Sequence, residues 1–288
     1  MAYVEEGSGP AVVLLHGFPT SAHLWSDLAP LLAPRFRVIA PDLIGYGDSE
    51  KPTTARLDVE AQAVYVRELL DRLGVNEYAV VGHDLGGGVA QLLALQGGTR
   101  VLILVDSITP RSELGTPLRP VETDGFDAAS AEALVRDRFE HGISRRGRLS
   151  DEDLEEFIRP WRRDPSGLAR AAHAAQADGI AGLENRLRDL DIPTLVLWGE
   201  DDPFVPSKHA EELWELLPDA SIALLPGCSH YVTADAPETA LPLILQFLRR
   251  RYLGEEGHDQ AYHTGPVPVD LGVSFERPPH PRDELVDE

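Results

Sequence analysis

Short apolar runs, each of four or five residues, recur along the chain and are bounded mostly by glycine, proline or polar residues. Continuous apolar runs of this length are typical of parallel strands that are buried on both faces of a sheet. The sequence therefore predicts strands at Ala11 to Leu15, Phe36 to Ala40, Tyr78 to Val81, Val101 to Val105, Thr194 to Trp198 and Ile222 to Leu225.

Amphipathic patterns with helical spacing lie between these runs. They predict helices at His23 to Leu32, Val59 to Leu73, Val89 to Gln96, His209 to Leu217 and Pro237 to Tyr252. An alternation of strands and helices predicts an α/β fold with a mostly parallel, doubly wound sheet that is covered by helices. In such sheets the functional loops follow the carboxyl ends of the strands.

One long segment breaks this alternation. Residues 110–190 are polar and rich in arginine and alanine, with helical patterns at Ala128 to Phe139, Asp151 to Arg159 and Gly167 to Ala177. We expect an inserted helical cap over the carboxyl ends of the strands. The chain then divides into a first part of the core at 1–109, the cap at 110–190, a second part of the core at 191–253 and a tail at 254–288.

The tail after Gly254 is rich in proline and acidic residues, a composition typical of a disordered terminus. Within it, Val267 to Phe275 has enough apolar alternation to form an edge strand. Only Met1 to Pro10 precede the first apolar run, which leaves room for little more than one short strand. We therefore expect Val267 to Phe275 to cover an unpaired sheet edge or to pair with a second subunit in a homodimer.

Composition limits the kinds of partner and the cellular location that we expect for this protein. The 288 residues carry a formal net charge of −22, which argues against nucleic acid or an anionic membrane as a partner. No apolar run approaches the length of a membrane span, and no export signal precedes the first strand. The only cysteine, Cys228, excludes an internal disulfide and fits a reducing compartment. We therefore expect a cytoplasmic protein.

The clearest chemical signal is the segment Val80-Val81-Gly82-His83-Asp84-Leu85-Gly86-Gly87-Gly88. A predicted strand enters it, a predicted helix leaves it, and glycines flank its centre, as in the tight turn that presents a nucleophile. The central residue is Asp84, and a carboxylate can attack carbon without a base to remove a proton first. The alternative is an aspartate that only caps the following helix.

Two later loops supply the groups that such a nucleophile needs. Asp202 follows the strand that ends at Trp198, and His230 follows the last predicted strand. Nucleophile, acid and histidine then occur in the chain order of an α/β-hydrolase catalytic triad. The backbone N–H groups of Phe18 and Leu85 are expected to form an oxyanion hole.

From Gly7 to about Leu253 the chain resembles α/β-hydrolases whose nucleophile is aspartate: haloalkane dehalogenases, fluoroacetate dehalogenases and epoxide hydrolases. The stretches His16-Gly-Phe-Pro-Thr-Ser and Ala40-Pro-Asp-Leu-Ile-Gly-Tyr-Gly-Asp-Ser-Glu-Lys-Pro52 are most similar to the haloalkane dehalogenases. The resemblance implies that Asp84 forms an alkyl ester and that His230 activates the water that hydrolyses it. Two residues remain candidates for the acid that orients His230. They are Asp202, which we favour, and Asp106, which follows an earlier strand.

The chain also departs from these families. It lacks a tryptophan after Asp84 to hold a halide, arginines after Asp84 to hold a carboxylate, and any tyrosine in 110–190 to polarise an epoxide. Trp161 and His173 are the only cap residues that we consider as replacement donors, and each could equally be packing or surface. His83 and His16 are expected to pack or brace rather than to react.

The sequence therefore predicts a hydrolase without a metal or other cofactor. Its substrates would be water and a small, mostly apolar organic molecule with a carbon–halogen or related carbon–heteroatom bond. The alternatives are an epoxide hydrolase with atypical cap donors and a non-catalytic, ligand-binding homologue.

Overall fold

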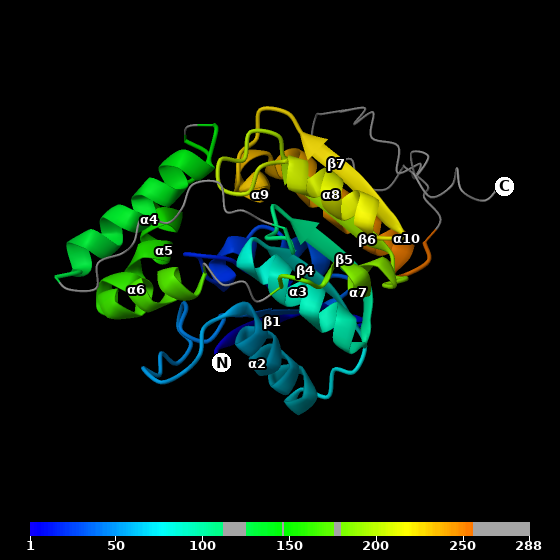
Figure 1. The fold of residues 1–288 in the computed structure, drawn as a ribbon, viewed down its shortest axis with the longest axis horizontal. Coiled ribbons are helices and arrows are strands. Elements are labelled where there is room, and N and C mark those ends of the chain that lie inside the picture. The colour runs from blue at the N-terminus through cyan, green and yellow to red at the C-terminus, as the bar shows by residue number, and fades with distance from the viewer. Residues whose placement is uncertain (112–124, 146, 176–179, 256–288) are drawn as a thin grey trace.

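A computed structural model describes residues 1–111, 125–145, 147–175 and 180–255 of the chain. In these ranges seven strands form one sheet in the order β1-β3-β2-β4-β5-β6-β7 (Figure 1). The strand β1 pairs antiparallel with β3, and the other neighbours are parallel. The strands are β1 (Tyr3–Glu6), β2 (Ala11–Leu15), β3 (Arg37–Pro41), β4 (Tyr78–His83), β5 (Thr99–Val105), β6 (Thr194–Gly199) and β7 (Ala220–Leu225).

The six predicted strands are confirmed, with ends that differ by no more than two residues. The first strand, β1, is exposed along its whole length and lies at the sheet edge, so no buried apolar run marks it in the sequence. The predicted tail strand Val267 to Phe275 lies outside the described residues. No helix in the described ranges is long and apolar enough to cross a membrane.

The helices around the sheet follow the predicted pattern with four differences. Two short helices, Glu184–Arg188 within the 110–190 segment and Val232–Asp235, have no counterpart among the predicted elements. The predicted helix His23 to Leu32 is wrong as one element: a 3-10 helix ends at Trp25, and a short α-helix that begins at Ala29 has a proline in its first turn. The helix after β4 begins at Leu85, earlier than predicted. Glycine disfavours helices, but a Cβ at Gly87 would lie 2.0 Å from the Ser107 hydroxyl oxygen. The elements are η1 (Ala22–Trp25), α1 (Ala29–Leu32), α2 (Val59–Arg72), α3 (Leu85–Gln96), α7 (Glu184–Arg188), α8 (Lys208–Leu216), α9 (Val232–Asp235) and α10 (Pro237–Arg251).

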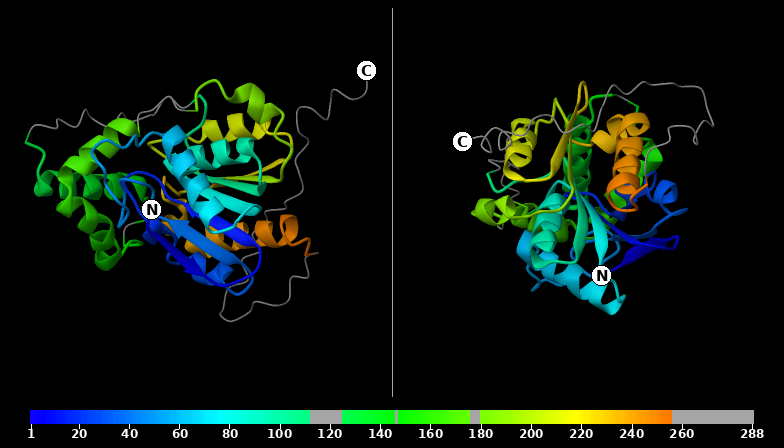
Figure 2. Two further views of the ribbon diagram at one scale, coloured as in Figure 1. Left: turned by 90° about the horizontal axis from the view of Figure 1, so that it is seen from below. Right: turned by 90° about the vertical axis from the view of Figure 1, so that its right-hand side faces the viewer.

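Helices cover both faces of the sheet, as the predicted doubly wound architecture requires (Figure 2). Alternate strand residues enter opposite cores because successive side chains of a strand point to opposite faces. Val13 and Leu15 pack with residues of α2, α3 and α8, whereas Val12 and Leu14 pack with residues of α1 and α10. The strand β2 is therefore buried on both faces.

Three helices of the insertion, α4 (Ala128–Gly142), α5 (Asp151–Arg163) and α6 (Pro165–Ala174), lie together at one end of the molecule, on the left of Figure 1. Each begins at a polar side chain that caps it. Asp127 accepts the N–H of Ser130, Ser150 that of Asp153, and Asp164 that of Gly167, at 2.9 to 3.0 Å. We call these three helices the cap.

Hydrogen bonds join the end of the cap helix α4 to the segment that follows β7. The Tyr231 N–H donates to the Gly142 carbonyl at 3.0 Å. The buried Asp235 carboxylate accepts the N–H groups of Ser144, Arg145 and Ser229 at 2.7 to 3.0 Å. The end of α4 is thereby fixed against the loop that carries His230.

Candidate active site

Asp84 lies in the turn between β4 and α3 with a backbone φ of +51° and ψ of −119°. A non-glycine residue with positive φ is strained, and such residues cluster at functional sites. The turn requires its flanking glycines: a Cβ at Gly82 would lie 2.4 Å from the Gly86 carbonyl oxygen, and a Cβ at Gly86 would lie 2.3 Å from the Leu15 carbonyl oxygen. This geometry is that of a nucleophile elbow.

Two backbone N–H groups stabilise the Asp84 carboxylate. Phe18 donates to Oδ2 at 2.9 Å, and the N–H of Leu85 is near enough to lower the pKa of the carboxylate. Burial raises the pKa of Asp84 above its ordinary value, whereas the charge of His230 and these two N–H groups oppose the rise. Both residues predicted for the oxyanion hole therefore point an N–H at Asp84.

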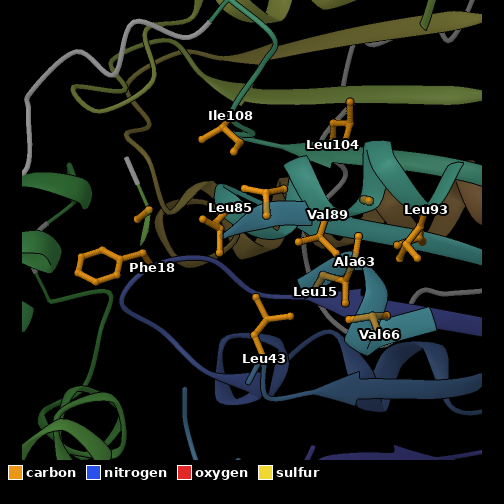
Figure 3. Packing of buried hydrophobic residues seen from close by; sticks show 14 of the residues in the cluster. Leu15, Phe18, Leu43, Ala63, Val66, Leu85, Val89, Leu93, Leu104 and Ile108 are labelled. Carbon is orange, nitrogen blue, oxygen red and sulfur yellow. The ribbon is translucent and has the colours of Figure 1, made fainter. Parts of the chain in front are cut away.

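The loop after β2 approaches Asp84 closely. A Cβ at Gly17 would lie 2.5 Å from Oδ2, so only glycine fits there. His16 braces this loop: its Nδ1 hydrogen-bonds the Gly17 carbonyl at 2.9 Å, and its Nε2 accepts the Leu43 N–H at 3.0 Å. Figure 3 shows Phe18, Leu85 and Ile108 at the end of the apolar core that faces the cap.

His230 lies between two carboxylates. Its Nδ1 hydrogen-bonds Asp202 Oδ2 at 2.8 Å, and its Nε2 lies 4.0 Å from Asp84 Oδ1. The latter distance is too long for a direct hydrogen bond. Burial lowers the pKa of His230, but the charge and hydrogen bond of Asp202 outweigh it, so the pKa is raised. The structure thus brings Asp84, His230 and Asp202 together.

Asp106, the other predicted acid, forms no hydrogen bond or ion pair with the His230 ring. Its carboxylate accepts the N–H of Gly199 at 2.8 Å and that of Val232 at 3.4 Å, and it joins the ends of neighbouring segments. Burial and the nearby charge of Asp202 hold the pKa of Asp106 well above its ordinary value. By contrast, the second oxygen of Asp202 accepts two N–H groups of its own loop, which fixes its orientation.

Neither predicted cap donor lies ready to bind a ligand. The indole N–H of buried Trp161 donates to the Pro19 carbonyl at 2.7 Å and joins the cap to the loop after β2. This bond uses its single hydrogen, so Trp161 is no longer a candidate donor. His173 is exposed in the last turn of α6, which agrees with a surface residue.

His83 packs, as expected. Its Nε2 donates to the His230 carbonyl at 2.9 Å, and its ring lies 4.7 Å from the His230 ring. Burial, together with the charge of His230, lowers the pKa of His83 well below its ordinary value. A neutral His83 therefore supports the backbone of His230.

Three residues around the site were not predicted. Tyr46 and Tyr231 are fully buried, and neither hydroxyl has a hydrogen-bond partner among the described residues. Burial and then the charge of Asp84 raise the pKa of both hydroxyls. The third is Arg138, a buried arginine of α4. Of the three, Tyr231 is the one that the sequence could indicate, because it follows His230 directly.

No group of three or more histidine, cysteine or acidic side chains that could hold a metal lies within the described ranges.

A capped α/β sheet with a carboxylate in a nucleophile elbow and a histidine–carboxylate pair beside it defines the α/β-hydrolase class. The profile of the alpha/beta hydrolase fold matches residues 10–237. The chain belongs to the α/β-hydrolase fold family and is a hydrolase of this superfamily.

Curated relatives agree with this assignment. The chain is 31% identical to the soluble epoxide hydrolase of Corynebacterium sp. (strain C12), with 86% of this chain and 93% of the relative covered. It is 29% identical to haloalkane dehalogenase 2 of Mycobacterium tuberculosis (strain ATCC 25618 / H37Rv), with 85% of this chain and 90% of the relative covered. Among solved structures, the meta-cleavage product hydrolase of Pseudomonas fluorescens IP01 superposes with a TM-score of 0.74. That similarity covers 86% of this chain and 93% of the other at 22% identity, so it bears on the fold alone.

Proposed function

We propose that this chain cleaves a carbon–halogen or related carbon–heteroatom bond of a small organic substrate through a covalent ester on Asp84. One observation carries the proposal. The Asp84 carboxylate offers Oδ2 to the Phe18 N–H, while Oδ1 lies 4.0 Å from the imidazole that Asp202 orients. A serine hydrolase needs its histidine to activate the nucleophile, whereas a carboxylate leaves the histidine free to activate water.

In the first step, Asp84 Oδ1 attacks the substrate carbon from the side opposite the leaving group. A carbon–oxygen bond forms, and the halide departs with the electron pair of the carbon–halogen bond. Oδ2 stays hydrogen-bonded to Phe18 and becomes the carbonyl oxygen of the ester. No proton moves in this step.

In the second step, a water that is hydrogen-bonded to His230 Nε2 gives its proton to the imidazole and attacks the carboxyl carbon of Asp84. The negative charge on Oδ2 is stabilised by the N–H groups of Phe18 and Leu85. Collapse of this intermediate expels the alcohol, which takes the proton from His230. The sum of the two steps is substrate and water giving alcohol, halide and one proton.

A second candidate, epoxide hydrolysis, is favoured by the two tyrosines. An epoxide oxygen remains bound to the product, so it needs hydrogen-bond donors as its ring opens. Tyr231 follows His230 directly, and Tyr46 packs edge-on against His16 at 5.3 Å between ring centroids. Their unpartnered hydroxyls are donors supplied by the core rather than by the cap. Relatives named haloalkane dehalogenase and soluble epoxide hydrolase support the two candidates about equally.

Product analysis tests the proposal. With a panel of short 1-bromoalkanes and 1,2-epoxyalkanes, we expect bromide and alcohol to appear in equal amounts, because each turnover breaks one carbon–bromine bond. The Asp84→Asn variant is the control and should release neither. Diol from the epoxides without bromide from the bromoalkanes would replace the first candidate with the second. Binding of both substrate classes without product or adduct would indicate a non-catalytic homologue.

The pH dependence of ester hydrolysis is a separate prediction. His230 must be neutral to accept a proton from water, so hydrolysis should become faster as pH rises through its pKa. In the ester, Asp84 no longer carries the charge that adds to the rise, but the charge and hydrogen bond of Asp202 remain. The midpoint should therefore lie above the ordinary histidine value of about 6.5. The decay of the covalent adduct after a single turnover measures this step alone. A midpoint below about 6.5 would contradict the assigned pairing.

A further inference from the structure

Arg138 is a buried cation that forms no ion pair with any residue that the structure describes. Its side chain projects from α4, the residue is 8% exposed, and its guanidinium lies 4.5 Å from the centroid of the Phe204 ring. Within the described ranges, its Nε–H has no hydrogen-bond partner and no carboxylate lies within salt-bridge distance of the guanidinium. Neighbouring Arg136 pairs with Glu132 at 2.8 Å, and Arg145, just after α4, pairs with Glu238 at 3.1 Å.

Such a buried cation is rarely left without an anion. Arginine is almost never fully buried unless it is paired, because removing its charge from water costs much more than packing returns. The face of Phe204 compensates in part, since an aromatic ring attracts a cation. The N–H donors of the guanidinium remain available for a planar anion.

Arg138 lies close to the candidate active site. The next residue, Phe139, stacks on Tyr231 with ring centroids 4.6 Å apart. Phe204, which lies under the guanidinium, contacts the His230 ring edge-on at 5.1 Å. The positive charge of Arg138 also opposes the rise in the pKa of His230. The Phe204 ring therefore lies between the Arg138 guanidinium and the His230 ring, and the charge of Arg138 acts on that histidine.

We infer that Arg138 binds a carboxylate of the substrate, remote from the carbon that Asp84 attacks. The inference rests on the proposed function and narrows its substrate to an apolar chain with a leaving group at one end and a carboxylate at the other. The guanidinium can bind both carboxylate oxygens. A net charge of −22 repels anions from a distance, so a local cation is needed to bind one.

Equilibrium binding to the parent chain tests this inference without any turnover. The probes are hexanoate, neutral hexan-1-ol of the same chain length, and bromide. We expect the parent to bind hexanoate about 10- to 100-fold more tightly than hexan-1-ol, the range for a charge-assisted hydrogen bond. Arg138→Gln should remove this preference, whereas Arg136→Gln, the surface control on the same helix, should keep it.

The inference is overturned if the parent shows no preference for hexanoate, or if Arg138→Gln retains that preference. It is also overturned if bromide alone depends on Arg138, because the cation would then hold the leaving group. If Arg138→Gln does not fold, Arg138→Met removes the charge but keeps a long, unbranched apolar side chain beside Phe204, and it serves as the second variant. A lower melting temperature with unchanged carboxylate binding would show that Arg138 only packs.

A kinetic comparison separates this inference from the proposed function. With 6-bromohexanoate and 1-bromohexane, loss of a remote contact that is present throughout the reaction should raise KM and leave kcat nearly unchanged. We expect Arg138→Gln to raise KM for the acid and not for the neutral substrate. Failure of the parent to release bromide from either compound would count against the proposed chemistry, whereas the binding result would still decide the role of Arg138.

Discussion

An Asp84→Asn variant should lose turnover while its melting temperature does not fall. The amide is near-isosteric but a poor nucleophile, and loss of a catalytic nucleophile in a comparable enzyme costs about 10⁶-fold in kcat. Burial raises the pKa of Asp84, so the ionised carboxylate destabilises the fold at any pH above that pKa. Replacing it with a neutral amide removes this penalty. Product formation and a melting curve measure the two effects.

A His230→Gln variant should complete the first step and stop before the second. Asp84 attacks without a base, but the hydrolytic water needs one, so the ester should accumulate. Intact-mass analysis then distinguishes the two candidate reactions. A haloalkane adds its alkyl group less one hydrogen, whereas an epoxide adds its full mass because its oxygen stays attached.

The control for this adduct is the double variant Asp84→Asn with His230→Gln, which should remain unmodified. Peptide mapping of the single variant should locate the added mass on Asp84. A His230→Gln variant that hydrolyses substrate at the parent rate would show that His230 does not activate the water. An adduct on another residue would refute Asp84 as the nucleophile.

Replacing Asp202 should be far more harmful than replacing Asp106. Asp202 orients His230 through a 2.8 Å hydrogen bond and stabilises the imidazolium that forms during hydrolysis. The equivalent change in a serine protease triad lowers kcat by about 10⁴-fold. We expect a loss of this order for Asp202→Asn, measured as the rate at which the covalent adduct decays.

Asp106→Asn is the matched comparison, since it makes the same chemical change in a neighbouring buried carboxylate. Asp106 accepts backbone N–H groups and forms no hydrogen bond or ion pair with the His230 ring. We expect its replacement to alter stability more than the rate of hydrolysis. A greater loss of hydrolysis with Asp106→Asn than with Asp202→Asn, in two folded proteins, would reverse the assignment of the acid.

The sequence predicted the sheet and the elbow because both depend on local patterns. Four or five consecutive apolar residues can satisfy a strand buried on both faces, and all six such runs are strands. The glycines at 82 and 86 mark the turn at Asp84 because no Cβ fits there. The edge strand β1 gave no such signal, since its residues are exposed and its pairing with β3 stabilises it. The helix that begins at Leu85 was predicted to begin later, because propensity argues against its glycines and only packing requires them.

By itself, therefore, the sequence determined the class of fold, the elbow that presents Asp84 and the order in which Asp84, Asp202 and His230 follow one another. Tertiary structure decided which carboxylate contacts His230, because Asp106 and Asp202 both end strands and only packing turns one toward the ring. Tertiary structure also brings the Trp161 N–H to the Pro19 carbonyl, 142 residues away in the chain, and places the Arg138 guanidinium over the Phe204 ring. Such contacts join distant segments. The direction of a side chain there depends on how the cap packs on the sheet, which no local pattern of residues encodes.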